Sequence, residues 1–284
     1  MAGQSELMEA LALEPAGEGR FVGHNLTSTP GSVVFGGQLP AQTVVAAATV
    51  DPSKEVKSVH TVFARGGSLD QNLEIEVEPM HLGRALGSAT VTIRQGERLC
   101  TRSLVLLSVA EPDLIRHQAD MPDVDRPEDA TPLGGESGFW EIRVVGGVDI
   151  SDPEAVGPAT LDVWVRFPVA TGGDTVGRAA IAYSSDGFLI GTAMRPHKGI
   201  GQSMAHVAFS TSVLTQTLSF HEPVVPDAWY LLAQESPYAG RGRSYGRSNV
   251  FSEDGRLVAS FVQDNMIRSF PEGQQPAPGG RSRY

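Results

Sequence analysis

The sequence has little of what would mark a secreted, nucleic-acid-binding or membrane protein. It holds one cysteine, Cys100, so no internal disulfide can form and a reducing compartment, the cytoplasm, is expected. Basic residues are scarce: 22 Lys and Arg against 33 Asp and Glu give a net charge of -11, which argues against a nucleic-acid surface. No apolar run approaches the roughly 18 residues of a membrane helix, and no signal peptide is recognisable. Neither nucleic acid nor a membrane is therefore an expected partner.

Motifs of several enzyme classes are missing too. The chain contains no Gly-x-Ser-x-Gly elbow, which weighs against a serine hydrolase. Its 7 His residues are scattered without the spacing of a metal site, so no metal and no cofactor are expected. Cys100 lies in a strand-like run without a nearby base, which favours a buried structural thiol over a nucleophile.

What the sequence does contain is an internal repeat. The stretch 63–106 aligns with 220–264, and each copy begins at an aromatic residue and passes a Gly-Arg pair, at 83–84 or 240–241, into a second strand. So long an interval indicates a duplicated domain rather than a solenoid, whose units are about 20–50 residues apart. A chain of 284 residues has room for two domains, and the seam between them is the first place to look for a small-molecule site.

Hydrophobic periodicity predicts the same elements in each half: a buried helix rich in small residues, then a meander of alternating strands. The first helix is expected over 39–50, directly after the FGGQ turn at 35–38, and the second between Gly177 and Gly187. Strand-like runs occupy 59–63, 73–77, 85–94 and 99–109 in the first half, and 140–145, 161–168, 212–221, 229–236, 244–252 and 257–267 in the second. These elements predict an α+β fold in which each domain is a long helix wrapped by an antiparallel sheet.

The composition also suggests domain boundaries. We expect an N-terminal domain over 1–110, a linker rich in Pro, Asp, Glu and Gly over 111–137, and a C-terminal domain over 138–270. The last segment, 271–284, is expected to be a flexible tail because it is rich in Pro, Gly, Gln and Arg.

Five short motifs, taken in order, resemble one family. They are FGGQ at 35–38, VHTVFARGG at 59–67, AYSSD at 182–186, FHEP at 220–223 and VASFVQDNMIR at 258–268. In this order they are similar to the type II acyl-CoA thioesterases, and the resemblance covers nearly the whole chain. It implies two fused hotdog domains, hydrolysis of acyl-CoA to free fatty acid and coenzyme A, and no cofactor. It also implies a homodimer or higher homo-oligomer, which an exposed strand edge in each half would favour.

The family hydrolyses its thioester without a covalent intermediate, using an Asp, a Thr or Ser, and a Gln that hold and activate a water. The resemblance places the Asp at Asp186 and the Gln at Gln263. A carboxylate at the edge of an apolar helix can act as a base, and the amide of Gln263 can fix the direction of attack. The alternatives are a solvated helix end for Asp186 and an exposed strand position for Gln263. Because an acid at the end of a helix opposes the helix dipole, some other reason for Asp186 is expected.

The hydroxyl position departs from the family pattern. Val213 stands where a Thr or Ser is expected, and valine cannot hold a water. Thr215, two residues along, is the best substitute because strand side chains alternate in direction, although it could equally be an ordinary strand former.

Four residues are expected to bind the substrate: Gly36, Gly37, Gln38 and His221. The glycines permit close approach to the backbone, whose N–H groups at a helix start can stabilise an oxyanion. The alternative is a plain turn before a helix, and for His221 a hydrogen-bonding residue at a strand end.

Two other functions remain open. A non-catalytic acyl-CoA-binding protein of the same fold would explain Val213. A hotdog enoyl-CoA hydratase would need an Asp and a His on one loop, and no such pair accompanies Asp186.

Overall fold

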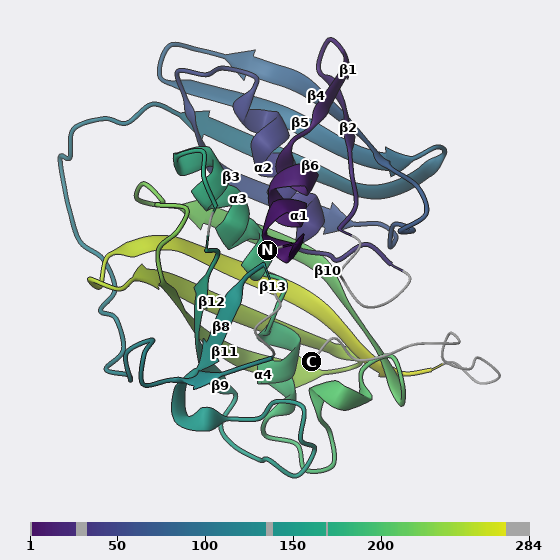
Figure 1. Ribbon diagram of the computed structural model, residues 1–284, viewed down its shortest axis with the longest axis vertical. Helices are drawn as coiled ribbons and strands as arrows, with labels where there is room; N and C mark the ends of the chain where they lie inside the picture. The colour runs from purple at the N-terminus through teal and green to yellow at the C-terminus, as the bar shows by residue number, and fades with distance from the viewer. Residues whose placement is uncertain (1, 27–32, 135–138, 169, 271–284) are drawn as a thin grey trace.

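The computed structural model describes residues 2–26, 33–134, 139–168 and 170–270 (Figure 1). The N-terminal half contains β1 (Glu14–Gly17), β2 (Arg20–Gly23), β3 (Glu55–Phe63), β4 (Leu73–Leu82), β5 (Leu86–Gln95) and β6 (Arg98–Ser108). The C-terminal half contains β7 (Thr131–Pro132), β8 (Glu141–Val144), β9 (Thr160–Arg166), β10 (Phe209–Phe220), β11 (Tyr230–Gly240), β12 (Arg243–Ser252) and β13 (Leu257–Ser269). Within these described ranges the strands form one 13-stranded sheet, in the order β1-β2-β4-β5-β6-β3-β10-β13-β12-β11-β9-β8-β7. The antiparallel pairing of β3 with β10 joins the two halves.

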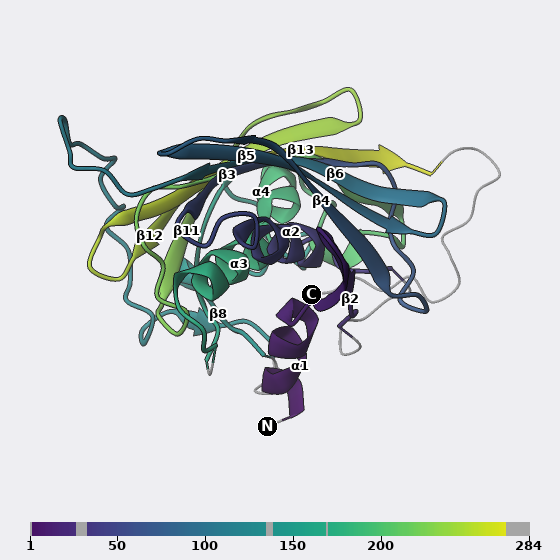
Figure 2. The same ribbon diagram turned by 90° about the horizontal axis from the view of Figure 1, so that it is seen from above.

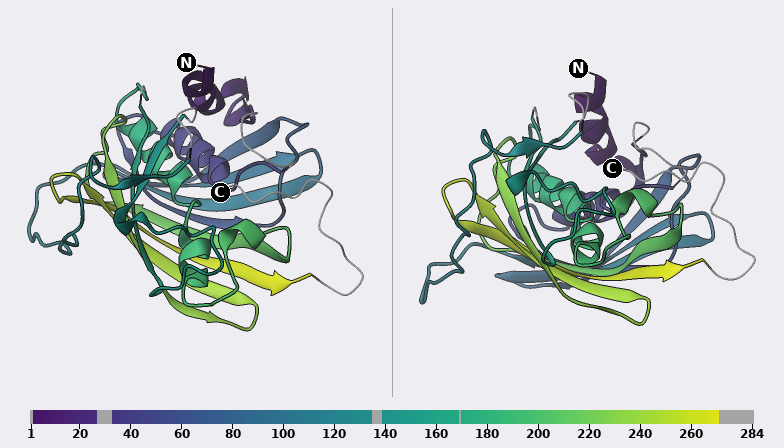
Figure 3. Two further views of the ribbon diagram at one scale, coloured as in Figure 1. Left: turned by 60° about the horizontal axis from the view of Figure 1, so that its bottom comes forward. Right: turned by 90° about the horizontal axis from the view of Figure 1, so that it is seen from below.

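Two helices lie side by side on one face of the sheet, α2 (Gln38–Ala48) from the first half and α3 (Asp174–Ser184) from the second (Figure 2). Their small residues allow this close packing, since alanines add little bulk between the helix axes. Helix α1 (Ala2–Leu11) lies beyond α2, on the side away from the sheet (Figure 3). The short helix α4 (Leu189–Met194) follows α3 and packs against β11 and β12.

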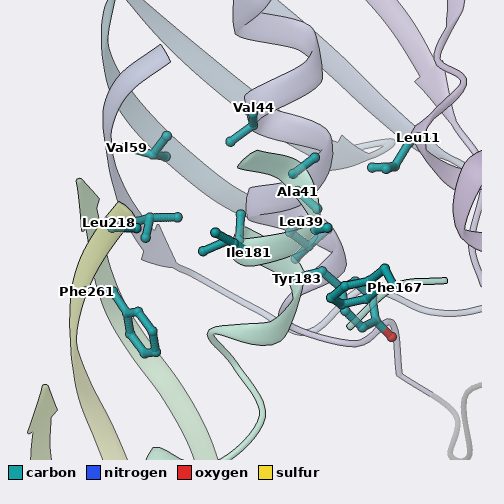
Figure 4. Packing of buried hydrophobic residues seen from close by; sticks show 14 of the residues in the cluster. Leu11, Leu39, Ala41, Val44, Val59, Phe167, Ile181, Tyr183, Leu218 and Phe261 are labelled. Atoms are coloured by element: carbon teal, nitrogen blue, oxygen red, sulfur yellow. The ribbon is translucent and has the colours of Figure 1, made fainter. Parts of the chain in front are cut away.

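The main core lies between this helix pair and the sheet, and both halves contribute to it. Val44 of α2 and Ile181 of α3 point toward Val59 of β3 and Leu218 of β10 (Figure 4). Val59 and Leu218 are directly opposite each other in the ladder that joins the halves. Because this core crosses the seam, the two halves are packed as one unit.

A buried arginine adds a polar tie across the seam. Arg178 of α3 is 3 % exposed, and its guanidinium donates to Val56 O at 2.8 Å, to Glu55 Oε2 at 2.7 Å and to the Asp174 carboxylate. The same group lies 5.1 Å from the ring centroid of Phe220. Several partners are what a buried cation requires, so α3 is held to β3 of the other half.

The segment before β7 covers the outer face of the C-terminal sheet. Met121 and Val124 pack against Trp164, and the indole Nε1 of Trp164 donates to Asp125 O at 2.8 Å. Part of the expected linker therefore lies on the sheet.

Every strand-like run expected from the sequence contains an observed strand, and the first expected helix is α2. The second helix begins three residues before Gly177, at Asp174, and the six-residue α4 was not expected. So short a helix carries too few turns for a periodic pattern. The expected tail, 271–284, lies outside the described residues.

Candidate active site

The end of α3 meets the start of α2 at the FGGQ turn. A Cβ on Gly37 would lie 2.1 Å from Tyr183 O, and a Cβ on Gly36 would lie 2.5 Å from Asp186 Oδ2. Real Cβ atoms do not make contacts this short, so only glycine permits this approach without a shift of its neighbours. The two glycines therefore let the backbone of one half touch the carboxylate of the other.

This contact supplies a physical reason for the position of Asp186. The residue follows Ser185, the C-cap of α3, where the dipole of α3 disfavours an acid. Its carboxylate, however, lies at the amino-terminal end of α2, where the partial positive charge favours an anion. Neither Gly36 N–H nor Gly37 N–H donates a hydrogen bond to another described residue. The half-buried carboxylate thus lies beside two backbone donors that other described groups do not use.

Two buried glutamines fasten the turn that carries Asp186. Gln263 of β13 donates from Nε2 to Ser185 O at 2.9 Å and to Gln216 Oε1 at 3.2 Å. Gln216 of β10 is directly opposite Gln263 and donates to Ser185 Oγ at 2.5 Å. Gln263 Oε1 accepts no hydrogen bond from the residues that the structure describes. The structure therefore brings Gln263 to the residue next to Asp186, with its amide orientation fixed and its oxygen unused.

Thr215 is not part of this arrangement. A β-bulge between Val213 and Thr215 shifts the register of β10, so that Val213 opposes Asn265 but Thr215 opposes Asp264. Val213 and Gln216 both face the core, whereas Thr215 Oγ1 donates to Asp264 Oδ2 at 3.2 Å on the exposed outer face. The expectation that Thr215 shares a face with Val213 is wrong, because the extra residue reverses the alternation of side chains.

Gln38 has a structural position. Its side chain is 1 % exposed; Nε2 donates to His24 O at 2.9 Å, and Oε1 accepts from Leu26 N–H at 3.1 Å. These bonds fasten the segment after β2 to the start of α2. The assignment of Gln38 to substrate binding is corrected accordingly, since its amide is engaged by the backbone.

His221 lies at the other end of α3. It follows β10 on the outer face, with Nε2 3.0 Å from Ser260 Oγ. Three residues later, Val224 N–H donates to Asp174 Oδ1 in the first turn of α3. The 11 residues of α3, about 16 Å of helix, separate this end from Asp186, so the structure does not bring His221 to the candidate site. Burial lowers the pKa of His221, and the nearby Lys57 lowers it further.

The equivalent place in the N-terminal half lacks the same groups. Counted from the helix N-caps, Gly37 and Gly173, the residue equivalent to Asp186 is Val50. The next residue, Asp51, hydrogen-bonds to Lys54 and Ser53, which lowers its pKa to about 2. An acid so strongly held as the anion is a poor base near neutral pH.

Aromatic rings pack around Tyr183, three residues before Asp186. Its ring centroid lies 4.8 Å from that of Phe35, 5.2 Å from that of Phe139 and 5.5 Å from that of Trp140. Phe167 also lies beside it (Figure 4). The turn bearing Asp186 is therefore held from the apolar side by rings from both halves.

Other chemistries have less support in the described parts of the chain. No group of three His, Cys, Asp or Glu side chains there could hold a metal ion, and no helix there is long and apolar enough to cross a membrane. Burial raises the pKa of the Cys100 thiol, which keeps it protonated and unreactive.

Sequence reasoning missed Ser185 and Gln216. The internal repeat could have pointed to Gln216. In the first half Val59 of β3 pairs with Val105 of β6, and at the equivalent positions of the second half Gln216 of β10 pairs with Gln263 of β13. Burying two glutamines where two valines would pack costs free energy unless their amides are hydrogen-bonded. Such a replacement therefore indicates that the amides have a role other than packing.

Comparison with known proteins identifies the family. Residues 25–108 match the acyl-CoA thioesterase N-terminal domain, and residues 117–267 match the acyl-CoA thioesterase C-terminal domain. Human acyl-coenzyme A thioesterase 8 is 28% identical over 289 residues, which cover 92% of this chain and 88% of that protein. Acyl-CoA thioesterase 2 of Haemophilus influenzae is 29% identical over 259 residues, covering 83% and 87%.

Solved structures agree. The acyl-CoA thioesterase II TesB2 from Mycobacterium marinum is 27% identical, with a TM-score of 0.78 over 97% of this chain and 100% of that one. A protein of unknown function with a hot dog fold from Alicyclobacillus acidocaldarius is 20% identical, with a TM-score of 0.76 over 93% and 98%, and shows the fold alone. The chain therefore has a hotdog fold and belongs to the type II acyl-CoA thioesterases, a family of thioester hydrolases.

Proposed function

We propose that the protein hydrolyses acyl-CoA to a free fatty acid and coenzyme A where α3 ends against α2, using a water held beside Asp186 and Gln263. One observation carries the proposal: the Asp186 carboxylate, the Gly36 and Gly37 N–H groups that no other described residue uses, and the oriented Gln263 amide all lie at the turn that ends α3. The names of the matched relatives support acyl-CoA as the substrate.

Each group has a chemical role in this proposal. Asp186 accepts a proton from the water, whose oxygen attacks the thioester carbonyl. The negative charge that develops on the carbonyl oxygen is stabilised by the N–H groups of Gly36 and Gly37. The tetrahedral intermediate then expels the coenzyme A thiolate, which takes the proton back from Asp186. The products are the carboxylic acid and the free thiol.

Gln263 holds the water at the correct angle. Both of its N–H groups are used, by Ser185 O and by Gln216 Oε1, so the amide cannot rotate and Oε1 points in one direction. An acceptor fixed in this way can take the second proton of the water in a hydrogen bond, which aligns the oxygen for attack. In this network Gln216 positions Gln263, and Thr215 is removed from the originally expected set of Asp186, Thr215 and Gln263.

We also infer that the chain consists of two fused hotdog units, because the strand order β2-β4-β5-β6-β3 of one half is mirrored by β9-β11-β12-β13-β10 of the other. A homodimer or higher homo-oligomer in the cytoplasm is part of the proposal. Val62 and Leu104, 56% and 51% exposed on the outer face of the N-terminal sheet, support association, because the chain itself covers the matching face of the C-terminal sheet.

Release of free thiol from a panel of acyl-CoAs tests the proposal. The variants are Asp186→Asn and, as a matched control, Asp264→Asn, which changes an acid on the outer face of the strand that carries Gln263. Asp186→Asn is expected to lower kcat about 100-fold to 10,000-fold while substrate binding persists, and Asp264→Asn is expected to stay near wild type. Full activity in Asp186→Asn contradicts the proposed base. Absence of thiol release by the wild type at every chain length favours the non-catalytic binding protein.

A further inference from the structure

The inner face of the C-terminal sheet is polar at positions where the N-terminal half is apolar. The pairing registers superimpose β4, β5, β6 and β3 on β11, β12, β13 and β10. At seven equivalent inward positions the N-terminal half has Val59, Val77, Gly87, Ala89, Val91, Val105 and Leu107. The C-terminal half has Gln216, Gln234, Ser244, Gly246, Ser248, Gln263 and Asn265, of which all but Gly246 are polar. The N-terminal half forms the same sheet without polar groups at these positions, so the fold does not require them.

The side chains of three of these polar residues have no hydrogen-bond partner among the described residues. Asn265 is 0% exposed, and neither its Oδ1 nor its Nδ2 makes a hydrogen bond. Gln234, 3% exposed, leaves both amide atoms unpaired, and Ser244, 1% exposed, leaves its hydroxyl unpaired. By contrast, Gln216 and Gln263 pair with each other. Buried polar groups are nearly always hydrogen-bonded, so three such residues on one face indicate that something outside the protein pairs with them.

We call Gln234, Ser244 and Asn265 the polar patch. One end of the polar patch, at Asn265, lies next to the proposed reaction centre. Asn265 lies two residues after Gln263 on β13, about 7 Å along the same face. Ser244 is directly opposite Asn265 on β12, and Gln234 lies on the next strand, β11.

Helix α4 covers this face of the sheet (Figure 1). The side chain of Leu189 fills the space over Gly246, between the two serines of β12, at 2.8 Å from the position that a Cβ would take. The polar patch therefore lies beneath α4, shielded from bulk water.

We propose that the polar patch binds a hydrogen-bonding group on the acyl chain, so that the enzyme prefers acyl-CoAs that carry a hydroxyl or keto group near the thioester over unsubstituted ones. The inference rests on the proposed function, because it takes Gln263 as the place where the thioester is held. The amides of Asn265 and Gln234 both donate and accept, which matches a hydroxyl group. A plain hydrocarbon chain would leave the buried amides unpaired, and a site of this kind rejects such an analogue.

The test compares pairs of acyl-CoAs of equal length, one unsubstituted and one carrying a hydroxyl group at successive positions near the thioester. The variants Asn265→Leu and Gln234→Val install the residues that the N-terminal half has, Leu107 and Val77. Asp264→Asn, which changes the outward-facing neighbour of Asn265, is the matched control. Circular dichroism checks that each variant folds, and two separate substitutions keep the test decisive if one of them does not.

In the wild type, kcat/KM for the best hydroxylated substrate is expected to exceed that of its plain partner at least about tenfold, the effect of one well-placed neutral hydrogen bond. Asn265→Leu and Gln234→Val are expected to reduce this ratio toward one by slowing the hydroxylated substrate, and the control retains the ratio. A wild-type ratio near one overturns the inference. The inference is also overturned if Asn265→Leu and Gln234→Val lower kcat/KM equally for the hydroxylated and the plain substrate of each pair. That result would assign the patch to the coenzyme A arm or to bound water.

Failure of the inference can be separated from failure of the proposed function. Binding of non-hydrolysable thioether analogues of the same pairs, measured by calorimetry, does not depend on catalysis. If the wild type hydrolyses no acyl-CoA, the proposed function fails. Binding of the thioether analogues then tests the polar patch without any activity measurement. Tighter binding of the hydroxylated analogue that is lost in Asn265→Leu supports the polar patch, and equal or undetectable binding of the two analogues overturns it.

Discussion

The contact between Gly36 and Asp186 predicts that one methyl group can separate activity from stability. In Gly36→Ala the new Cβ would lie 2.5 Å from Asp186 Oδ2, whereas ordinary contact begins at about 3.4 Å. The backbone at Gly36 does not have the positive φ that restricts alanine, so the end of the Asp186 side chain is the group that must move. The carboxylate is therefore displaced by about 1 Å.

A displacement of that size in a positioned catalytic group costs about 100-fold in rate. We expect Gly36→Ala to lower kcat for thiol release about 100-fold. Its free energy of unfolding is expected to stay within about 1 kcal/mol of wild type, because alanine also reduces the entropy of the unfolded chain. The measurements are kcat by thiol release and stability by urea denaturation.

Gly37→Ala is the informative contrast. Its Cβ would lie 2.1 Å from the backbone carbonyl oxygen of Tyr183, which cannot turn aside as a side chain can. Overpacking against backbone predicts a loss of about 1–3 kcal/mol in stability. If Gly36→Ala folds normally and keeps the wild-type kcat, the Asp186 carboxylate at the start of α2 is not the working base.

Two further predictions follow from the outer face of the sheet. Thr215→Val removes a hydroxyl that, among the described residues, bonds to the exposed Asp264, so kcat is expected to remain within about twofold of wild type, and a large loss would return Thr215 to the site. His221 has a pKa below its ordinary value of 6.5, so the unfolded chain binds its proton first and stability falls as the pH drops below about 6.5. His221→Gln is expected to flatten that fall below about pH 6.5, measured as urea midpoints, without changing kcat; an unchanged slope would contradict the assignment.

Much of the fold could be predicted because it follows from local rules. Strand alternation, turn glycines and the repeat gave the strands of both halves, and α2 is a run of small apolar residues after a glycine turn. The hotdog fold itself came from resemblance and is confirmed by solved structures. The short α4 could not be predicted because a helix of six residues owes its existence to packing against β11 and β12.

The site was harder to predict because its decisive features are not local. Alternation along β10 placed Thr215 on the inner face, but the bulge after Val213 depends on pairing with β13 and leaves no mark in the sequence of β10 alone. The approach of Gly36 to Asp186 joins residues 150 positions apart, so only the packing of α2 on α3 reveals it. The expectation for Gln263 came from its motif alone and stays a prediction.

Helices α2 and α3 form two junctions, one at each end of the helix pair, and different residues occupy them. Where α3 ends and α2 begins, Asp186 faces glycine backbone, and nearby amides hold its turn in place. Where α2 ends and α3 begins, Asp174 accepts from Val224 N–H and pairs with Arg178, which also bonds to Glu55. The second junction thus holds one ion pair across the seam, Arg178 with Glu55, which stabilises the placement of α3 on β3. Because α3 is a single rigid element, fixing its first turn also fixes the direction in which its last turn presents Asp186, so the contacts at the start of α3 support the position of that carboxylate.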